Sequence, residues 1–227
     1  MHPIHTSLTY YPRLTTMKLA WTAFTFALTA TSVFAGHELT APGKETKAVV
    51  EPSPFEKGRH EFQLGLGYNF AINSDTATRP DIQDLNLYAR YGWMLTSPSG
   101  GGIFRGNLEL LAELFVGGVT SGPGDIMAGA SLLLRYNFVQ ENSKWVPYFQ
   151  IGVGGVYSDI YEDKVQRLVG QAIEFNLQGG FGLRYLINNH LAAYLEANYR
   201  HISNADTADR NNGLNSIGVQ AGVSWFF

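Results

Sequence analysis

The chain has 227 residues, 25 glycines and no cysteine; 13% of its residues are aromatic, 15% are charged, and its formal net charge is −3. The length suits a single domain, the absence of cysteine excludes disulfides and an acylated N-terminal cysteine, and the acidic excess argues against a nucleic-acid partner. We expect no cofactor, and we expect no metal because His2, His5, His37, His60 and His190 are scattered without the spacing of metal ligands.

The first segment has the features of an export signal. An almost wholly apolar or small run, residues 19–34, follows two basic residues and leads into a small-x-small cleavage site that ends at Ala35. The run is short for a helix that spans a membrane. We therefore predict a signal peptide over residues 1–35, with Met17 as the more natural start, and an extended N-terminal lead-in over residues 36–57.

From residue 58 onward, apolar and polar residues alternate with the period of a β-strand. In the seventh alternating segment, for example, Leu191, Ala193 and Leu195 share one face, and Tyr194 and Glu196 share the other. The eight segments cover residues 61–70, 85–93, 108–116, 126–138, 149–154, 175–185, 191–203 and 217–227. Strands of about ten residues cross a bilayer when tilted. The pattern therefore predicts an all-β fold, an eight-stranded antiparallel transmembrane β-barrel over residues 58–227.

The polar face of these strands favours a membrane barrel over a soluble barrel or sandwich with an apolar core. Four acids and four arginines on this face can pair inside a narrow lumen, where unpaired charges would be costly. They are Glu61, Glu109, Glu113, Glu196, Arg90, Arg135, Arg184 and Arg200. On the other face, aromatic residues near the strand ends are placed like interfacial girdles. An eight-stranded barrel is just wide enough for side chains to fill it, so we predict a filled lumen.

The final strand resembles the signal read by the barrel assembly machinery of Gram-negative bacteria. Phe227 ends the chain, and apolar residues occupy every second position back to Ile217. Together with the export signal, this predicts the cell outer membrane of a Gram-negative bacterium as the location and the assembly machinery as a partner during biogenesis. If the chain starts in the periplasm, odd-numbered strands run outward, and the seventh strand ends at the outer leaflet.

His201 and Ser203 continue the apolar face of the seventh strand, so a base and a nucleophile lie on the side expected to face lipid. The motif Tyr199-Arg200-His201-Ile202-Ser203-Asn204-Ala205, followed by Asn212-Gly213-Leu214-Asn215, resembles the signature of the lipid A 3-O-deacylase family. The likeness in topology covers residues 59–227, and the motif covers the last two strands and their loop.

This resemblance implies a metal-independent outer-membrane serine esterase that acts on lipid A, or lipopolysaccharide, at the outer leaflet. Ser203 would attack the ester carbonyl, and His201 would take the serine proton and return it to the leaving group. The family's acid, normally a glutamate, lies twelve residues beyond the serine, where this chain has Asn215. An asparagine can orient the imidazole through its carbonyl, as in the Ser-His-Asn arrangement of outer-membrane phospholipase A, but it supplies no negative charge. Asn204 is a candidate oxyanion donor.

Several alternatives stay open at the level of the sequence. Asp206 or Asp209 in the loop after Ser203 could replace Asn215 as the third member of the site. Four loop cations are either contacts for lipid A phosphates or ordinary solvated charges: Arg79, Lys164, Arg167 and Arg210. The chain is a lipid A deacylase, a phospholipase-like esterase, or a non-catalytic adhesion or envelope barrel with a degenerate site. A homodimer is a further partner that the sequence does not test.

Overall fold

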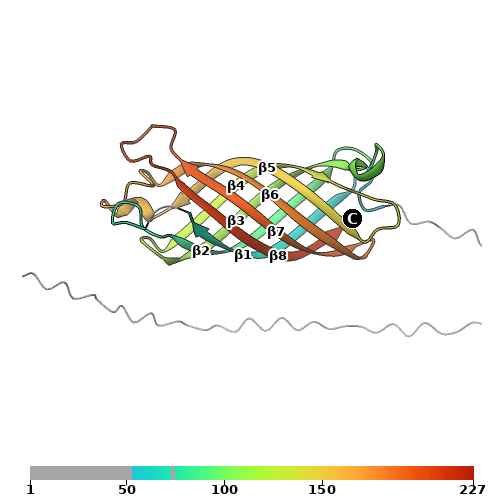
Figure 1. Ribbon diagram of the computed structural model, residues 1–227, viewed down its shortest axis with the longest axis horizontal. Helices are drawn as coiled ribbons and strands as arrows, with labels where there is room; N and C mark the ends of the chain where they lie inside the picture. The colour runs from blue at the N-terminus through green and yellow to red at the C-terminus, as the bar shows by residue number, and fades with distance from the viewer. Residues whose placement is uncertain (1–52, 73–74) are drawn as a thin grey trace, which may run out of the picture. The chain divides into compact units, whose positions relative to one another are not determined.

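The computed structural model describes residues 53–72 and 75–227, so the predicted signal peptide and most of the predicted lead-in lie outside the described residues. Eight strands form a closed antiparallel barrel in which each strand pairs with the next and β8 pairs with β1 (Figure 1). The strands are β1 (His60–Ala71), β2 (Gln83–Met94), β3 (Asn107–Ser121), β4 (Ile126–Asn137), β5 (Trp145–Ser158), β6 (Ile173–Asn188), β7 (Leu191–Ser203) and β8 (Leu214–Phe226). Within the described residues, no helix is long and apolar enough to cross a membrane.

The predicted eight-stranded barrel is confirmed, and several strands are longer than the alternation indicates. β3 continues beyond residue 116 because Gly117 and Gly118 stay paired with β2. A side chain at Gly117 would collide with Asn86, so glycine permits this close pairing. At the other end of the sequence, β8 begins at Leu214 rather than residue 217, which places Asn215 inside a strand.

The barrel is apolar outside and polar inside. On β7 the outward Leu195 is 57% exposed, whereas the inward Tyr194 and Glu196 are 4% and 1% exposed. On β6 the outward Phe181 is 76% exposed. An apolar surface that surrounds the whole barrel is far larger than the patches that water-soluble monomers expose, and it suits the hydrocarbon region of a bilayer. This inversion identifies the barrel as a transmembrane one.

Glu196 is the centre of one half of the charged lumen. Its carboxylate accepts hydrogen bonds from Arg90 at 2.9 Å, from Tyr148 at 2.8 Å and from Gln150 at 3.0 Å. Arg90 also pairs with Glu113 at 2.6 Å. Both acids and the arginine are buried, so these contacts replace the water that the charged groups would otherwise bind.

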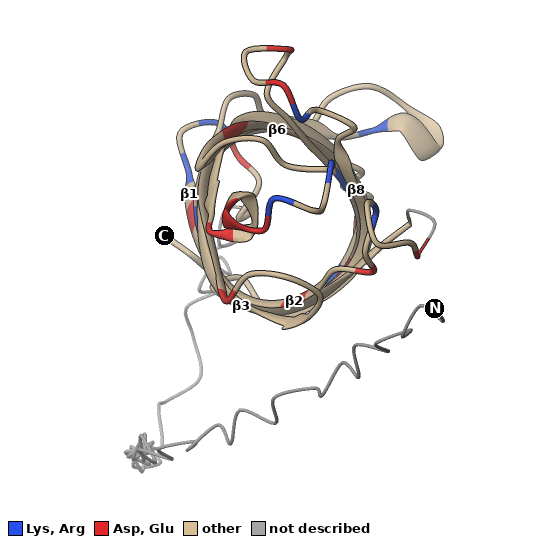
Figure 2. Cartoon of the chain, turned by 90° about the vertical axis from the view of Figure 1, so that its left-hand side faces the viewer, with Lys and Arg blue, Asp and Glu red and all other residues tan. Residues whose placement is uncertain are grey.

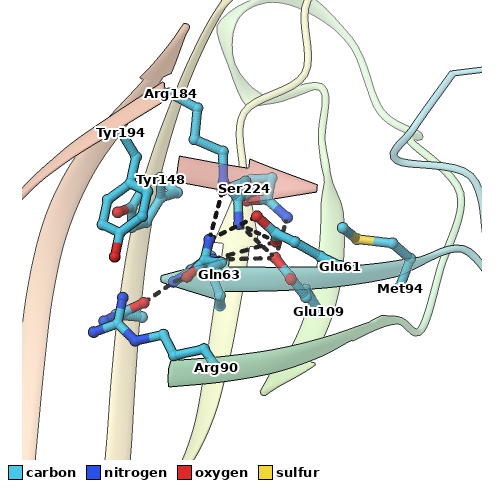
Figure 3. A network of polar contacts seen from close by, with 12 residues as sticks. Glu61, Gln63, Arg90, Met94, Glu109, Tyr148, Arg184, Tyr194 and Ser224 are labelled. Atoms are coloured by element: carbon cyan, nitrogen blue, oxygen red, sulfur yellow. Dashed lines mark hydrogen bonds and ion pairs between the residues drawn. The ribbon is translucent and has the colours of Figure 1, made fainter. Parts of the chain in front are cut away.

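Arg184 joins the other half of the charged lumen (Figure 3). One of its guanidinium nitrogens contacts both Glu61 and Glu109, and another donates to Asn137 at 2.7 Å. Arg135 lies 3.7 Å from Glu61 and 3.5 Å from Glu109, which links the two acids a second time. The predicted pairing of acids and arginines inside the lumen is therefore confirmed.

Arg200 has a partner that the alternating pattern did not include. Its guanidinium donates to both carboxylate oxygens of Asp84, at 2.8 and 2.9 Å. Asp84 lies one residue before the predicted start of the second strand, and the observed β2 begins at Gln83. The longer strand turns Asp84 into the lumen, where it completes the set of ion pairs.

Apolar clusters lie at the two ends of this charged lumen. At the end of the barrel where β1, β3, β5 and β7 finish, a buried cluster comprises Ile82, Tyr88, Phe115, Met127, Val156, Ile160, Leu168, Val169, Ile202 and Leu214. Figure 2 views the barrel from this end, with loops crossing its opening. At the opposite end the cluster comprises Phe55, Met94, Val139, Val146, Ala192 and Phe226.

Phe55 comes from the last part of the predicted extended lead-in. The chain turns over residues 54–58, and the Phe55 ring is fully buried against Phe226, with 5.4 Å between the ring centroids. The Asn107 amide donates to the Phe55 carbonyl at 2.9 Å and fixes the turn. The contacts of the folded barrel thus begin before residue 58.

The charged lumen gives a first test of stability. Changing Glu196 to glutamine should lower the free energy of unfolding by about 3–5 kcal/mol, because the buried Arg90 loses a charged partner. Urea-induced unfolding in lipid vesicles, followed by tryptophan fluorescence, measures this difference.

Glu141→Gln is the matched control. Glu141 pairs with Arg105 at 3.6 Å, and its side chain is 78% exposed. The same chemical change should therefore alter the free energy of unfolding by less than about 1 kcal/mol. Equal losses in the two variants would contradict a stabilising role for the lumen charges.

Candidate active site

The candidate site lies where β7 ends and β8 begins, on the outward face of the barrel. His201, Ser203 and Asn215 are all half-buried, and they alternate with inward residues that are buried. His201 and Asn215 are direct partners in the antiparallel register of β7 and β8. Because partners across a ladder have neighbouring Cβ atoms, their side chains meet without a change in the backbone.

The imidazole of His201 contacts the side-chain carbonyl of Asn215. His201 Nδ1 lies 2.7 Å from Asn215 Oδ1. A carbonyl oxygen only accepts hydrogen bonds, so this contact places the imidazole proton on Nδ1 and leaves Nε2 free to accept one. That is the tautomer a general base needs when its outer nitrogen faces a serine.

Tyr199 also contacts Asn215, and sequence reasoning gave it no role in the site. Its hydroxyl donates to Asn215 Oδ1 at 2.6 Å. Tyr199 shares the outward face of β7 with His201, and Asn215 lies diagonally across the ladder from it. The sequence signal that could have identified Tyr199 is its position two residues before His201, which places both on the same face of the strand. The tyrosine side chain is long enough to reach Asn215 diagonally across the ladder.

Ser203 is the last residue of β7 and lies opposite Phe175 of β6. It shares its face with His201, and the two positions are one strand period apart. Within residues 53–72 and 75–227, the structure records no hydrogen bond between the Ser203 hydroxyl and His201. Such contacts are often long in a free enzyme and tighten when substrate binds.

Gly213 lies against the His201 ring. Its φ is +77°, and a Cβ atom added there would come within 2.8 Å of His201 Cε1. The Gly213 N–H donates to the Leu168 carbonyl at 3.1 Å, and the neighbouring Asn212 N–H donates to the Arg167 carbonyl at 2.9 Å. The loop before β8 is thus held by the loop before β6, and glycine leaves room for the imidazole.

Asn204 turns inward at the end of β7. Its side-chain amide donates to Glu174 at 3.0 Å and to the Arg210 carbonyl at 2.9 Å, and its own N–H donates to Asn211 at 2.9 Å. These contacts use its donors to anchor the loop that follows Ser203. The geometry therefore favours an anchoring role for Asn204, and an oxyanion role stays a prediction.

The loop acids lie apart from this contact. Asp206 is exposed, and its carboxylate accepts a hydrogen bond from Asn211 at 2.7 Å; Asp209 is also exposed. Of the three residues considered as the third member, the structure brings Asn215 to His201. Among the described residues, no group of three or more histidine, aspartate or glutamate side chains is placed to hold a metal ion.

The four loop cations differ in their surroundings. The Arg210 guanidinium donates to three backbone carbonyls of the loop before β6, those of Tyr161, Asp163 and Gln166, at 2.6–3.1 Å. Arg210 is therefore a structural link between two loops. The other three cations are exposed: Arg79, Lys164 and Arg167.

Comparisons with known proteins add a family to this geometry. Similar solved structures include Neisserial surface protein A, NspA (14% identity, TM-score 0.52, covering 75% of this chain and 100% of that chain) and the outer membrane enzyme PagL (15% identity, TM-score 0.49, covering 70% of this chain and 97% of that chain). The outer membrane protein OprG from Pseudomonas aeruginosa is 18% identical, with a TM-score of 0.45, and covers 78% of this chain and 99% of that chain. A comparison with curated proteins gives no match.

The likeness to NspA supports the fold of the barrel and carries no argument about activity. The family model described as lipid A 3-O-deacylase (PagL) matches residues 64–224, from β1 to β8. This match spans well over half of the chain and includes the whole candidate site. The chain therefore belongs to the lipid A 3-O-deacylase (PagL) family.

Proposed function

We propose that this protein is an outer-membrane esterase that hydrolyses the acyl chain at the 3-O position of lipid A, in the outer leaflet of a Gram-negative bacterium. The observation that carries the proposal is the 2.7 Å contact between His201 and Asn215 on the lipid-facing wall, with Ser203 on the same face. Membership of the lipid A 3-O-deacylase family supports the substrate class.

The proposed mechanism uses Ser203 as nucleophile and His201 as base. As the Ser203 hydroxyl oxygen bonds to the ester carbonyl carbon, its proton passes to His201 Nε2. Collapse of the tetrahedral intermediate breaks the bond to the sugar oxygen, which takes that proton from His201. Water then attacks the acyl-serine with the same help, releasing a free fatty acid and restoring the serine. Throughout these steps the proton stays on His201 Nδ1, which donates a hydrogen bond to Asn215 Oδ1.

Asn215 stabilises the protonated form of His201 less than a glutamate at this position would. Its carbonyl can orient the imidazole and fix the tautomer, but it has no full negative charge to stabilise the imidazolium that forms during attack. We therefore expect slower turnover than a glutamate at the same position would give, with the same product.

The outer wall beside the site offers room for an acyl chain. An apolar groove of about 600 Å³ is bounded by Leu132, Ile151, Leu177 and Tyr199 and has Gly179 in its floor. A second groove, of about 580 Å³, shares Ile151, Gly179 and Tyr199. Gly179 occupies an outward position of β6, so the wall is hollow there. An ester that enters from the bilayer can keep its acyl chain in this groove, which positions the carbonyl without extracting the lipid.

The location of the site in the outer leaflet is part of the proposal. The loops before β2, β4, β6 and β8 lie at the same end of the barrel as Ser203, and the longest connection between two strands, residues 159–172, is among them. In the predicted topology this is the external end, where lipid A resides. The exposed apolar residues on the outward face of β8, Ile217, Val219 and Trp225, support recognition by the barrel assembly machinery during biogenesis.

A phospholipase-like esterase is the second candidate. The observation that favours it is the Ser-His-Asn set itself, since outer-membrane phospholipase A uses the same three residue types. The grooves do not discriminate between acyl chains of lipid A and of glycerophospholipids. The products therefore have to distinguish the two substrates.

Mass spectrometry of lipid A and phospholipids from cells that express this protein tests both candidates. We expect the wild type to remove one hydroxyacyl chain from lipid A and Ser203→Ala to remove none, because the nucleophile is lost. Ser143→Ala, a serine change at the opposite end of the barrel, should behave as the wild type does.

Two results would replace the proposal. Cleaved phospholipids with intact lipid A would assign the phospholipase activity. Unchanged lipids of both classes, with the wild-type barrel folded in the outer membrane, would point to a non-catalytic adhesion or envelope protein.

Asn215→Glu tests the role of the missing charge. This change should raise kcat by about tenfold or more, because a carboxylate both orients the imidazole and stabilises the imidazolium. Initial rates of acyl release from purified lipopolysaccharide in detergent measure the gain. An unchanged or lower kcat in a folded variant would argue that imidazolium formation does not limit turnover.

Gly213→Ala tests the packing under the imidazole. The added Cβ would press on His201 Cε1, so we expect at least about a tenfold loss of kcat as the ring moves from its hydrogen bond. Gly102→Ala is the control, since Gly102 also has a positive φ, +60°, but no atom lies within 4 Å of its added Cβ. Equal activity of the two variants would contradict the proposed position of the ring.

A further inference from the structure

The side chain of Asn215 can take two orientations that are chemically different, whereas the two orientations of a glutamate carboxylate are equivalent. Both ends of a carboxylate are acceptors, whereas an asparagine has a carbonyl at one end and an NH₂ group at the other. If the amide turned over, its NH₂ group would face His201 Nδ1 and would require that nitrogen to be unprotonated. The imidazole proton would then lie on Nε2, which could no longer take the proton of Ser203. The site therefore needs something that selects one orientation of the amide.

Tyr199 is in the place to make this selection. Asn215 Oδ1 accepts two hydrogen bonds, from Tyr199 at 2.6 Å and from His201 at 2.7 Å. A carbonyl oxygen has two lone pairs, so both are used. The three side chains come from one face of two paired strands, where Tyr199 is opposite Ile217 and His201 is opposite Asn215.

We propose that Tyr199 is a positioning residue: its hydroxyl holds the Asn215 carbonyl toward His201 and so keeps the imidazole in the tautomer that can act as a base. This rests on the proposed function for its effect on catalysis, but the orientation itself is a property of the folded protein. Tyr199 replaces part of what a glutamate does, the part that concerns geometry rather than charge.

The alternative orientation is unfavourable because of Tyr199. A turned Asn215 would offer NH₂ to the Tyr199 oxygen, and the hydroxyl hydrogen of Tyr199 would lose its acceptor beside an apolar wall. His201 does not discriminate in the same way, because a neutral imidazole can either donate or accept a hydrogen bond at Nδ1. Without the tyrosine hydroxyl, this penalty is absent, and the turned form becomes populated.

Tyr199→Phe removes the hydroxyl and keeps the ring that lines the groove. In acyl release from purified lipopolysaccharide, kcat should fall about 3- to 10-fold with KM unchanged, the size expected for one hydrogen bond. In an Asn215→Glu background the same change should alter kcat by less than about twofold, because a carboxylate needs no orientation. Tyr157→Phe is the matched control: Tyr157 is also outward and 43% exposed, as Tyr199 is, and should leave kcat unchanged in both backgrounds.

An equal loss of kcat in the two backgrounds would overturn the proposal and give Tyr199 a general structural role. A rise in KM with kcat unchanged would also overturn it and would assign the tyrosine to binding of the acyl chain alone. Either pattern is distinct from failure of the proposed function, in which the wild type releases no acyl chain.

A direct measurement of the tautomer does not depend on activity. Nitrogen-15 NMR of the histidine side chains in detergent-solubilised barrel, at alkaline pH, distinguishes a protonated Nδ1 from a protonated Nε2, with His201→Gln to assign the signals. We expect a single Nδ1-protonated form of His201 in the wild type and a mixture in Tyr199→Phe. The same single form in both proteins would overturn the proposal even if the enzyme is active.

Discussion

Closure of the barrel by pairing of β8 with β1 is the constraint on which the rest depends. Inside a bilayer no water is available to the backbone, so every strand needs a hydrogen-bonded neighbour on both sides. The register from Glu61 opposite Phe226 to Ala71 opposite Ser216 supplies the last of these neighbours. Once the cylinder is closed, each residue must face either lipid or lumen. Charged residues then lie inside. His201 faces outward because it lies an even number of residues after the outward Leu191 on β7.

Much of the fold could be predicted because the alternation of apolar and polar residues along a strand can be recognised without knowing which strand pairs with it. The alternation in residues 191–203 assigned Tyr194 and Glu196 to the lumen and His201 and Ser203 to the outer wall, as the structure has them. The position of Asp84 in the lumen was not predicted, because the alternation of the second strand becomes clear only at Leu85. The burial of Phe55 was not predicted for another reason. A turn followed by a long-range contact with Phe226 produces no local pattern in the sequence.

The residues of the candidate site and the contact between His201 and Asn215 could be predicted, whereas the other contacts of the site could not. The motif supplied His201, Ser203 and the position of Asn215, and the register of two strands then determined which side chains meet. The inward turn of Asn204 depends on Glu174 and Arg210, which are 30 and 6 residues away. The Tyr199 contact depends on a diagonal across the ladder. Such contacts follow from the assembled barrel, and a single sequence does not display them.

The two apolar clusters that close the charged lumen have a consequence for the cell. An ion that entered the barrel would have to lose its hydration at Phe55 and Phe226 on one side and at the Ile202 cluster on the other. An apolar cluster therefore separates the charged centre of the barrel from each of its ends. Because the proposed chemistry takes place on the outer wall, substrates and products move sideways within the bilayer. The protein can remain in the membrane without weakening it as a permeability barrier.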